Sequence, residues 1–214
     1  RAELAKSLGA DIIMMMPPYH GALLKGNPDQ IFEQFNEISE VGIPIMIQDA
    51  PLSGIDLSVP LLTKMINEIE NLTCFKIESA QAASKIRALI NNCSERLDAP
   101  FDGEESITLY ADLEAGISGS MSSALLPEKI APVIDHFWNN EKDKAEEVYN
   151  GILPLINFEN RQCGFRATKT VMKEGGVIKS DFCRDPIKPL DQDTKNLLLN
   201  FAKRYDLLTY KWGK

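Results

Sequence analysis

Residues 73–79 read TCFKIES, a short β-branched and aromatic run with a lysine at its centre. Strand residues alternate between two faces, so Lys76 and Glu78 share one face while Phe75 and Ile77 point to the other. A charged pair on one face has two explanations. Either the strand lies at a wet sheet edge, or two ionisable groups point together into a confined space.

The run belongs to a series of strand-like segments separated by helical ones. Strand-like runs occupy residues 11–16, 43–48, 72–78, 99–103 and 116–122. Segments of helical period occupy residues 28–41, 58–70, 80–92 and 104–114, followed by 127–139, 141–158, 160–174 and 192–205. Alternation of apolar strands with helices is typical of βα units and of a parallel sheet that is buried on both faces.

Five such strands fit two architectures. An open doubly wound sheet is complete with five, whereas a (β/α)8 TIM barrel needs eight. The opening RAELAKSLGAD has Leu4, Leu8 and Gly9 in the pattern of a helix end. An opening in mid-helix favours a barrel that lacks its first three βα units. We therefore expect strands four to eight of the barrel in residues 1–138 and a C-terminal helical region in residues 139–214.

Composition argues against several classes of function. The chain is 44% hydrophobic and 25% charged with a net charge of −8, which disfavours non-specific nucleic-acid binding. No apolar stretch approaches the roughly 20 residues of a transmembrane helix, and no G-x-G-x-x-G or P-loop follows a strand. The methionines at 14–16 are expected to fill the core rather than bind metal. Four widely spaced cysteines indicate reduced thiols in a cytoplasmic protein (Cys74, Cys93, Cys163, Cys183).

Five segments, taken in chain order, indicate the family of the chain. They are GADIIMMMPPY (9–19), IPIMIQDAP (43–51), FKIES (75–79), FDGEES (101–106) and GISGSMSS (116–123). Together they resemble the dihydrodipicolinate synthase/N-acetylneuraminate lyase family. The resemblance implies a Schiff-base (β/α)8 enzyme that acts on a small 2-keto acid and needs no metal or organic cofactor. Lys76 falls on the family's sixth-strand lysine, which implies that its amine attacks the keto carbon. Four stretches, IQDAPLSG, FKIE, PFDGEESITL and residues 159–184, are most similar to 2-keto-3-deoxy-L-arabonate dehydratases.

The strand before the lysine departs from the family pattern. Most members have a tyrosine there that relays protons, whereas this chain has Gln48, which cannot carry a proton at neutral pH. An aldolase must deprotonate the C4 hydroxyl, while a dehydratase removes a C3 proton and releases that hydroxyl as water. Gln48 therefore favours elimination, with Glu78 as the base. The alternative is a degenerate site in which Glu78 only forms a structural ion pair.

Further candidate residues lie near the ends of strands, where barrels collect substrate groups. Two of them match family positions that often read Tyr-Tyr, of which the second reaches into a neighbouring subunit's site. The family's carboxylate-binding arginine has no counterpart in APLSG, so polar groups nearby and hydroxyls of the last strand are candidates for that task. The predicted substrate-binding residues are Tyr19, His20, Asp49, Ser53, Gly103, Glu104, Ser118 and Ser120.

We therefore expect a cytoplasmic hydro-lyase that dehydrates a small 2-keto-3-deoxy sugar acid. The resemblance implies that 2-keto-3-deoxy-L-arabonate is converted to 2,5-dioxopentanoate and water. One alternative is a retro-aldol or dihydrodipicolinate-synthase-like enzyme of the same family. Another is an inactive ligand-binding relative, because the family's second-strand Gly/Thr motif would precede Arg1. The resemblance also implies a homo-oligomer, with the family's tendency to form tetramers. Unpaired sheet edges further predict that these residues alone assemble through those edges or are poorly soluble.

Overall fold

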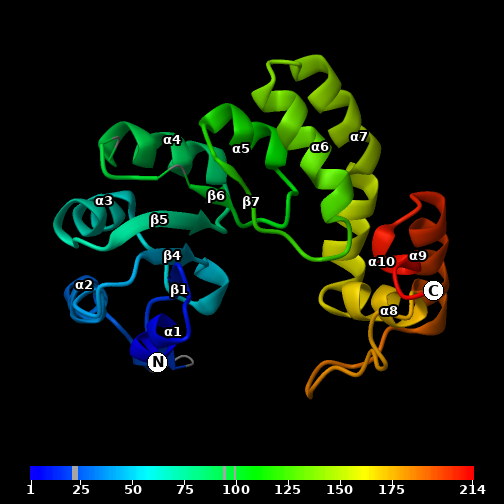
Figure 1. The fold of residues 1–214 in the computed structure, drawn as a ribbon, viewed down its shortest axis with the longest axis horizontal. Coiled ribbons are helices and arrows are strands. Elements are labelled where there is room, and N and C mark those ends of the chain that lie inside the picture. The colour runs from blue at the N-terminus through cyan, green and yellow to red at the C-terminus, as the bar shows by residue number, and fades with distance from the viewer. Residues whose placement is uncertain (21–23, 94, 99) are drawn as a thin grey trace. The chain divides into compact units, whose positions relative to one another are not determined.

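The computed structural model describes residues 1–20, 24–93, 95–98 and 100–214. These residues form two compact units, of which unit 1 comprises 1–104 and 111–121 and unit 2 comprises 105–110 and 122–214. Figure 1 labels the elements of both. The division at residue 138 remains a prediction about domains, and the compact units do not coincide with it, because helix α6 (Pro127–Trp138) falls in unit 2.

Unit 1 is built on a parallel five-stranded sheet, as the alternating pattern predicts. Its strands are β1 (Ile13–Met15), β4 (Ile45–Asp49), β5 (Leu72–Ile77), β6 (Phe101–Asp102) and β7 (Gly119–Ser120). They lie side by side in chain order. Each successive βα unit therefore adds its strand at the same edge of the sheet, which is the strand order of a (β/α)8 barrel.

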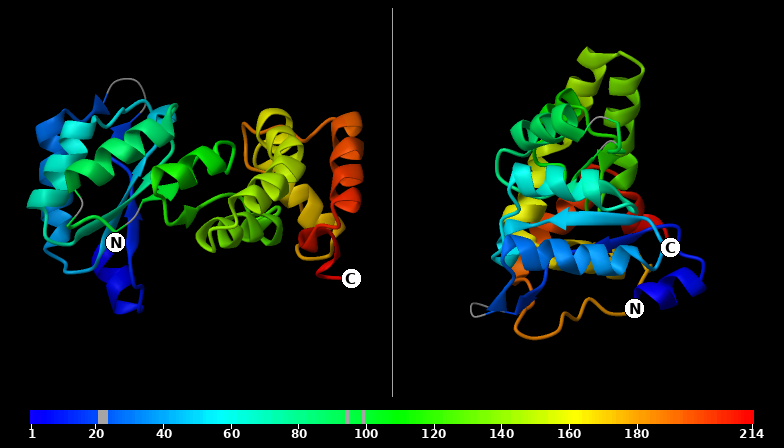
Figure 2. Two further views of the ribbon diagram at one scale, coloured as in Figure 1. Left: turned by 90° about the horizontal axis from the view of Figure 1, so that it is seen from above. Right: turned by 90° about the vertical axis from the view of Figure 1, so that its left-hand side faces the viewer.

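Helices connect these strands. They are α1 (Ala2–Ser7), α2 (Pro28–Ser39), the 3-10 turn η1 (Pro51–Ser53), α3 (Val59–Glu68), α4 (Ala82–Cys93) and α5 (Leu109–Ala115). Asn27 and Gln30 form a capping box at the start of α2, and Ser58 accepts the backbone N–H of Leu61 at the start of α3. Gly9 follows α1 with φ +84°, the left-handed conformation that glycine adopts without steric cost. Figure 2 shows α2, α3 and α4 as a layer beside the strands.

The core of unit 1 lies between the sheet and this helix layer. Alternate residues of β4 and β5 are fully buried there (Ile45, Ile47, Phe75, Ile77), as are apolar side chains of the helices (Phe35, Leu62, Ile66, Ile86, Leu89). Each such side chain contributes about 1.5–3 kcal/mol by leaving water. The same alternation leaves Gln48 and Lys76 on the inner face of the sheet.

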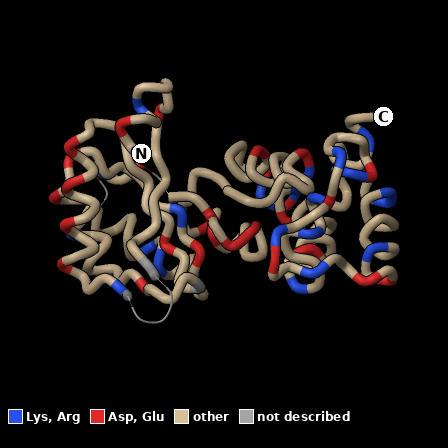
Figure 3. The backbone as a smooth tube through the Cα atoms, turned by 90° about the horizontal axis from the view of Figure 1, so that it is seen from below, with Lys and Arg blue, Asp and Glu red and all other residues tan. Residues whose placement is uncertain are grey.

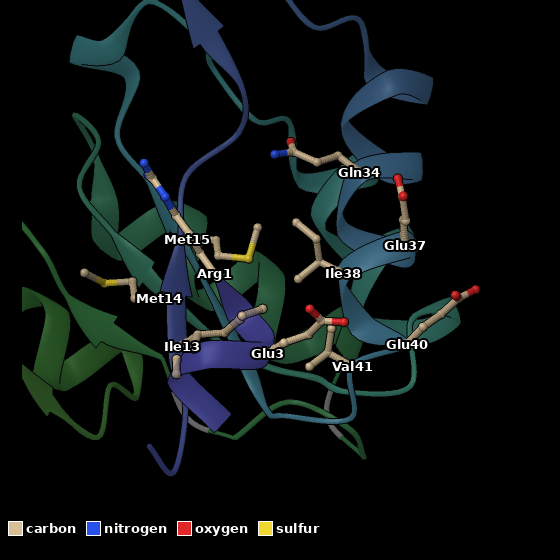
Figure 4. A pocket seen from close by; sticks show the side chains of 12 residues that line it. Arg1, Glu3, Ile13, Met14, Met15, Gln34, Glu37, Ile38, Glu40 and Val41 are labelled. Atoms are coloured by element: carbon tan, nitrogen blue, oxygen red, sulfur yellow. The ribbon is translucent and has the colours of Figure 1, made fainter. Parts of the chain in front are cut away.

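A hollow of about 970 Å³ lies beside strand β1. Figure 4 shows Ile13, Met14 and Met15 of β1 on one side of it and side chains of α2 on the other. The described residues that line it lie within 1–15 and 34–41. The prediction that the methionines at 14–16 fill the core is wrong for Met14, which is 45% exposed, and Met15 and Met16 are only half-buried. Its strand lies at an edge of the sheet and pairs with β4 on one side.

A short antiparallel hairpin follows β1 and was not predicted. It consists of β2 (Tyr19–His20) and β3 (Leu24–Lys25), with Tyr19 opposite Lys25 and His20 opposite Leu24. Two-residue strands carry too little alternation for a sequence pattern to reveal them.

Unit 2 is helical. Besides α6 it contains α7 (Lys142–Phe158), the π-helical turn η2 (Glu159–Cys163), α8 (Arg166–Glu174), α9 (Gln192–Arg204) and α10 (Leu208–Lys211). Helices α6 and α7 pack together, and α8 contacts both α9 and α10. Helix α8 ends at Glu174, and the next residue has to be glycine, because a Cβ on Gly175 would lie 2.0 Å from the carbonyl oxygen of Thr209.

Charged residues of both signs are interspersed within each unit (Figure 3). Lysines of α8, in the basic stretch 161–173, are bound within unit 2: Lys173 pairs with Asp181 at 2.9 Å, and Lys169 donates to the carbonyl oxygen of Phe182. Helix α8 is thus tied to the segment that follows it. Across the described ranges, no helix is long and apolar enough to cross a membrane.

We expect Glu159 to make the stability of the folded chain depend on pH. This residue is 5% exposed and accepts hydrogen bonds from Ser123 and Thr168. Burial raises the pKa of its carboxyl from 4.5 to about 7, and Glu105 adds to the shift. The folded state therefore favours the protonated form of the Glu159 carboxyl. The contribution of this group to the free energy of unfolding is fully present below pH 4.5 and is lost as the pH rises through 7.

We expect Glu159→Gln to flatten this dependence. Between pH 4.5 and 7 the free energy of unfolding should fall less in the variant than in the wild type, by up to about 3 kcal/mol. Urea unfolding at a series of pH values measures the difference. Glu147→Gln, at an exposed position of α7, is the matched control and should keep the wild-type slope. Equal slopes in Glu159→Gln and wild type would contradict the buried-acid assignment.

Candidate active site

Lys76 lies near the end of β5, where it is in register with Gln48 on β4 and Phe101 on β6. Strand β5 is therefore flanked on both sides and is not a sheet edge. Residues in register on parallel strands point to the same face, so Gln48 and Lys76 share the inner face with Glu78. Lys76 is 8% exposed. The structure therefore supports the explanation that Lys76 and Glu78 point together into a confined space, and not that they lie at a solvent-exposed sheet edge.

The three side chains form one network. Lys76 Nζ lies 3.4 Å from Glu78 Oε2, and Gln48 Nε2 donates a hydrogen bond of 2.6 Å to the same oxygen. The amide of Gln48 thus holds the carboxylate beside the amine. An amine that becomes neutral can attack a carbonyl carbon, and a carboxylate at this distance can move a proton on atoms attached to that carbon.

Gly103 borders this pair, as predicted for a residue that follows β6. A Cβ at this position would lie 2.9 Å from Lys76 Cγ and 3.0 Å from Glu78 Cβ, closer than unstrained carbon atoms approach. Its backbone N–H donates to the carbonyl oxygen of Ile77 at 2.8 Å, which extends the pairing of β5 and β6. Only glycine leaves room for both side chains at this point. A contact between Gly103 and a substrate stays a prediction.

Asp49 lies on the opposite face of β4 from Gln48 and is fully buried. Its Oδ2 is 2.6 Å from Nζ of Lys85 on α4. Burial raises the pKa of the Asp49 carboxyl, and Lys85 partly offsets this. The carbonyl oxygen of Asp49 accepts the backbone N–H of Glu78 at 2.9 Å. This placement supports an anchoring role for Asp49, and its predicted contact with substrate stays untested.

Two of the predicted hydroxyl ligands, Ser118 and Ser120, donate hydrogen bonds near the strand ends. Ser120 Oγ donates to Asp102 Oδ2 at 2.6 Å, and Ser118 Oγ donates to the carbonyl oxygen of Pro100 at 3.4 Å. Glu104 donates its backbone N–H to Asp102 Oδ1 at 2.8 Å. The hydroxyl of Ser53, in η1, is buried without a hydrogen-bond partner among the described residues. Substrate contacts by Glu104 and these serines stay predictions.

Tyr19 and His20 lie in hairpin strand β2. Their backbone pairing is described, whereas their side chains fall outside what the structure describes. The roles predicted for them at a neighbouring subunit's site stay predictions.

Sequence reasoning missed two residues that support the site. From the sequence, Lys85 is only one residue of a helical segment. Its partner Asp49 lies 36 residues earlier in the chain, and no local sequence pattern connects residues so far apart. Asp102 carried a signal, because Asp before Gly is typical of a turn in which the side chain accepts a backbone N–H. Within the described residues no group of three or more His, Cys, Asp or Glu side chains could hold a metal ion.

The fold is that of barrel enzymes with solved structures. Dihydrodipicolinate synthase from Aquifex aeolicus matches with a TM-score of 0.86 and 23% identity, over 96% of this chain and 69% of that one. The enzyme from Rhodopseudomonas palustris matches with a TM-score of 0.84 and 23% identity, over 95% and 69% of the two chains. The prediction of a TIM barrel of which these residues form a part is therefore confirmed, and the doubly wound alternative is wrong.

Residues 1–204 match the Dihydrodipicolinate synthetase family, and the chain belongs to it. It is 46% identical over 214 residues to L-2-keto-3-deoxyarabonate dehydratase of Azospirillum brasilense, covering all of this chain and 69% of the relative. It is 25% identical over 211 residues to 4-hydroxy-tetrahydrodipicolinate synthase of Helicobacter acinonychis, covering 97% and 68% of the two chains. The family resemblance inferred from the sequence is confirmed.

Proposed function

We propose that the protein is a lyase that dehydrates a 2-keto-3-deoxy sugar acid, 2-keto-3-deoxy-L-arabonate, to 2,5-dioxopentanoate. The observation that carries this proposal is the Gln48–Glu78–Lys76 network on the inner face of the sheet. The 46% identity to a relative described as a dehydratase of this substrate supports it independently. The lysine itself supplies the electron sink, so the proposed reaction uses no cofactor.

The proposed reaction begins when the neutral amine of Lys76 attacks C2 of the keto acid. Loss of water gives an iminium that acidifies the protons on C3. Glu78 removes one of these protons, and the resulting enamine expels the C4 hydroxyl, which leaves as water after taking up a proton. The C3=C4 double bond then moves to C4=C5 as a proton is lost from C5 and C3 takes up a proton. The resulting C5 enol becomes the aldehyde when C4 is protonated and the enol hydroxyl loses its proton. Hydrolysis of the iminium consumes one water and releases product and lysine. The overall change is the loss of one water.

Gln48 explains why elimination is favoured over cleavage. Retro-aldol cleavage needs a base on the C4 hydroxyl, and an amide does not serve as one near neutral pH. Its hydrogen bond of 2.6 Å to Glu78 instead fixes the carboxylate next to Lys76. The base thus lies where it can reach C3 of a substrate that is bound through C2 to the lysine.

The products distinguish the two reactions. With 2-keto-3-deoxy-L-arabonate, the full chain should form a semialdehyde and no pyruvate. Parallel assays coupled to a semialdehyde dehydrogenase and to lactate dehydrogenase measure both products. Gln48→Tyr should reduce semialdehyde formation and release some pyruvate, because the phenol can act as the missing base. Pyruvate as the main product of the unmodified chain would instead support the retro-aldol alternative, and no product of either kind would support the inactive relative.

A homo-oligomer in the cytoplasm completes the proposal. The four cysteines, all among the described residues, form no disulfide, which supports a reducing compartment. One structurally similar relative is described as a monomeric dihydrodipicolinate synthase variant, so assembly has to be measured for this protein. Light scattering on the full chain should give a mass of several subunits, and a monomer mass would contradict this part of the proposal.

A further inference from the structure

The carboxylate of Asp102 joins three parts of unit 1. Asp102 ends β6 and is fully buried. Its Oδ1 accepts the backbone N–H of Glu104 at 2.8 Å, which closes a turn around Gly103. Its Oδ2 accepts the hydroxyl of Ser120 on β7 at 2.6 Å. The Asp102 side chain therefore stabilises the turn that follows β6 and also links this turn to strand β7.

This turn forms a wall of the lysine face. Its middle residue, Gly103, lies against the stems of Lys76 and Glu78, so closely that an added Cβ would be 2.9–3.0 Å from both. Hydrogen bonds on both sides hold the backbone there: Gly103 N–H donates to Ile77 O at 2.8 Å, and Met121 N–H donates to Asp102 O at 2.9 Å. A displacement of the turn therefore changes the space in which the amine and the carboxylate meet.

We infer that Asp102 is a positioning residue for the Lys76–Glu78 pair, an inference that rests on the proposed function. Asp102 points to the face opposite Lys76, in register with Ile77 and Ser120, and so acts through the turn rather than on substrate. A carboxylate suits this position because Oδ1 accepts from Glu104 while Oδ2 accepts from Ser120. Asparagine has one acceptor oxygen, and its NH2 group cannot accept from the second donor.

Asp102→Asn should lower kcat about 10²-fold, the cost of misplacing reacting groups by about 1 Å, with a smaller change in KM. The borohydride adduct at Lys76 should still form, but the pH at which its formation is half-maximal should shift, because the distance between Lys76 and Glu78 changes. Ser120→Ala should act in the same direction, and Ser120→Thr, which keeps the hydroxyl, should restore the wild-type pH profile. Where Asp102→Asn fails to fold, the two Ser120 variants decide the question.

Asn71→Ala is the matched control. It removes the 2.8 Å hydrogen bond from Asn71 Nδ2 to Ser39 O, at the other end of β5, and should lower Tm without changing kcat or the pH profile. The inference is overturned if the Asp102 and Ser120 variants lose stability in the manner of Asn71→Ala and keep the wild-type profile. Absence of any adduct in the unmodified chain would overturn the proposed function and this inference together.

Discussion

Replacing Lys76 with arginine is expected to abolish turnover and adduct formation. The guanidinium keeps the positive charge beside Glu78 but is never deprotonated at working pH, so it cannot attack a carbonyl carbon. Activity should fall to the background of the product assay, a larger effect than any other single change considered. Residual activity above that background would show that another group forms the covalent bond.

Lys85→Arg is the matched control for this experiment. Both lysines are largely buried and paired with a carboxylate, since 10% of the Lys76 side chain and 13% of the Lys85 side chain is exposed. Arginine at position 85 can keep its ion pair with Asp49 on the outer face of β4. The control variant should therefore retain turnover. If both variants lost activity equally, the loss would reflect packing and not the nucleophile.

Glu78→Gln is expected to separate binding from chemistry. Glutamine keeps the shape of the side chain but cannot take a proton from C3, so turnover should fall by roughly 10²–10⁴-fold, the usual contribution of a general base. The covalent adduct at Lys76 should persist, because attack on C2 does not need this carboxylate. Adduct yield and kcat measured on the same preparation give both quantities.

Asp56→Asn serves as the control for Glu78→Gln. It makes the same carboxylate-to-amide change at an exposed residue, 3.5 Å from Lys85, and should leave kcat unchanged. Full activity in Glu78→Gln would remove Glu78 from the mechanism and favour the structural ion pair. Loss of the adduct together with turnover would show that Glu78 is needed earlier, to form the imine.

The sequence predicted the inner face well where alternation governs it. Lys76 and Glu78 are two residues apart on one strand, so the period of two placed both on one face. Gln48 was assigned from the family resemblance, and the register of β4 with β5 puts it on the same face. The same rule could have separated Asp49 from Gln48, because adjacent strand residues point to opposite faces. The carboxylate of Asp49 pairs with Lys85, and its contact with substrate stays a prediction.

Other features depend on contacts that one sequence does not encode locally. The pairing of Asp102 with Ser120 follows from the register of β6 and β7, which are only two residues long each. The exposure of Met14 depends on which strand lies beside β1. The structure describes the backbone of Tyr19 and His20 but not their side chains, so the sequence remains the basis for their predicted roles.

Borohydride reduction followed by peptide mass spectrometry tests the central claim most directly. The full chain is mixed with 2-keto-3-deoxy-L-arabonate or pyruvate, reduced, digested and mapped. A Schiff base on Lys76 predicts one substrate-dependent mass increase, located on the peptide that contains residues 73–79 and absent from Lys76→Arg. An adduct on another lysine, or none in the unmodified chain, would contradict the account.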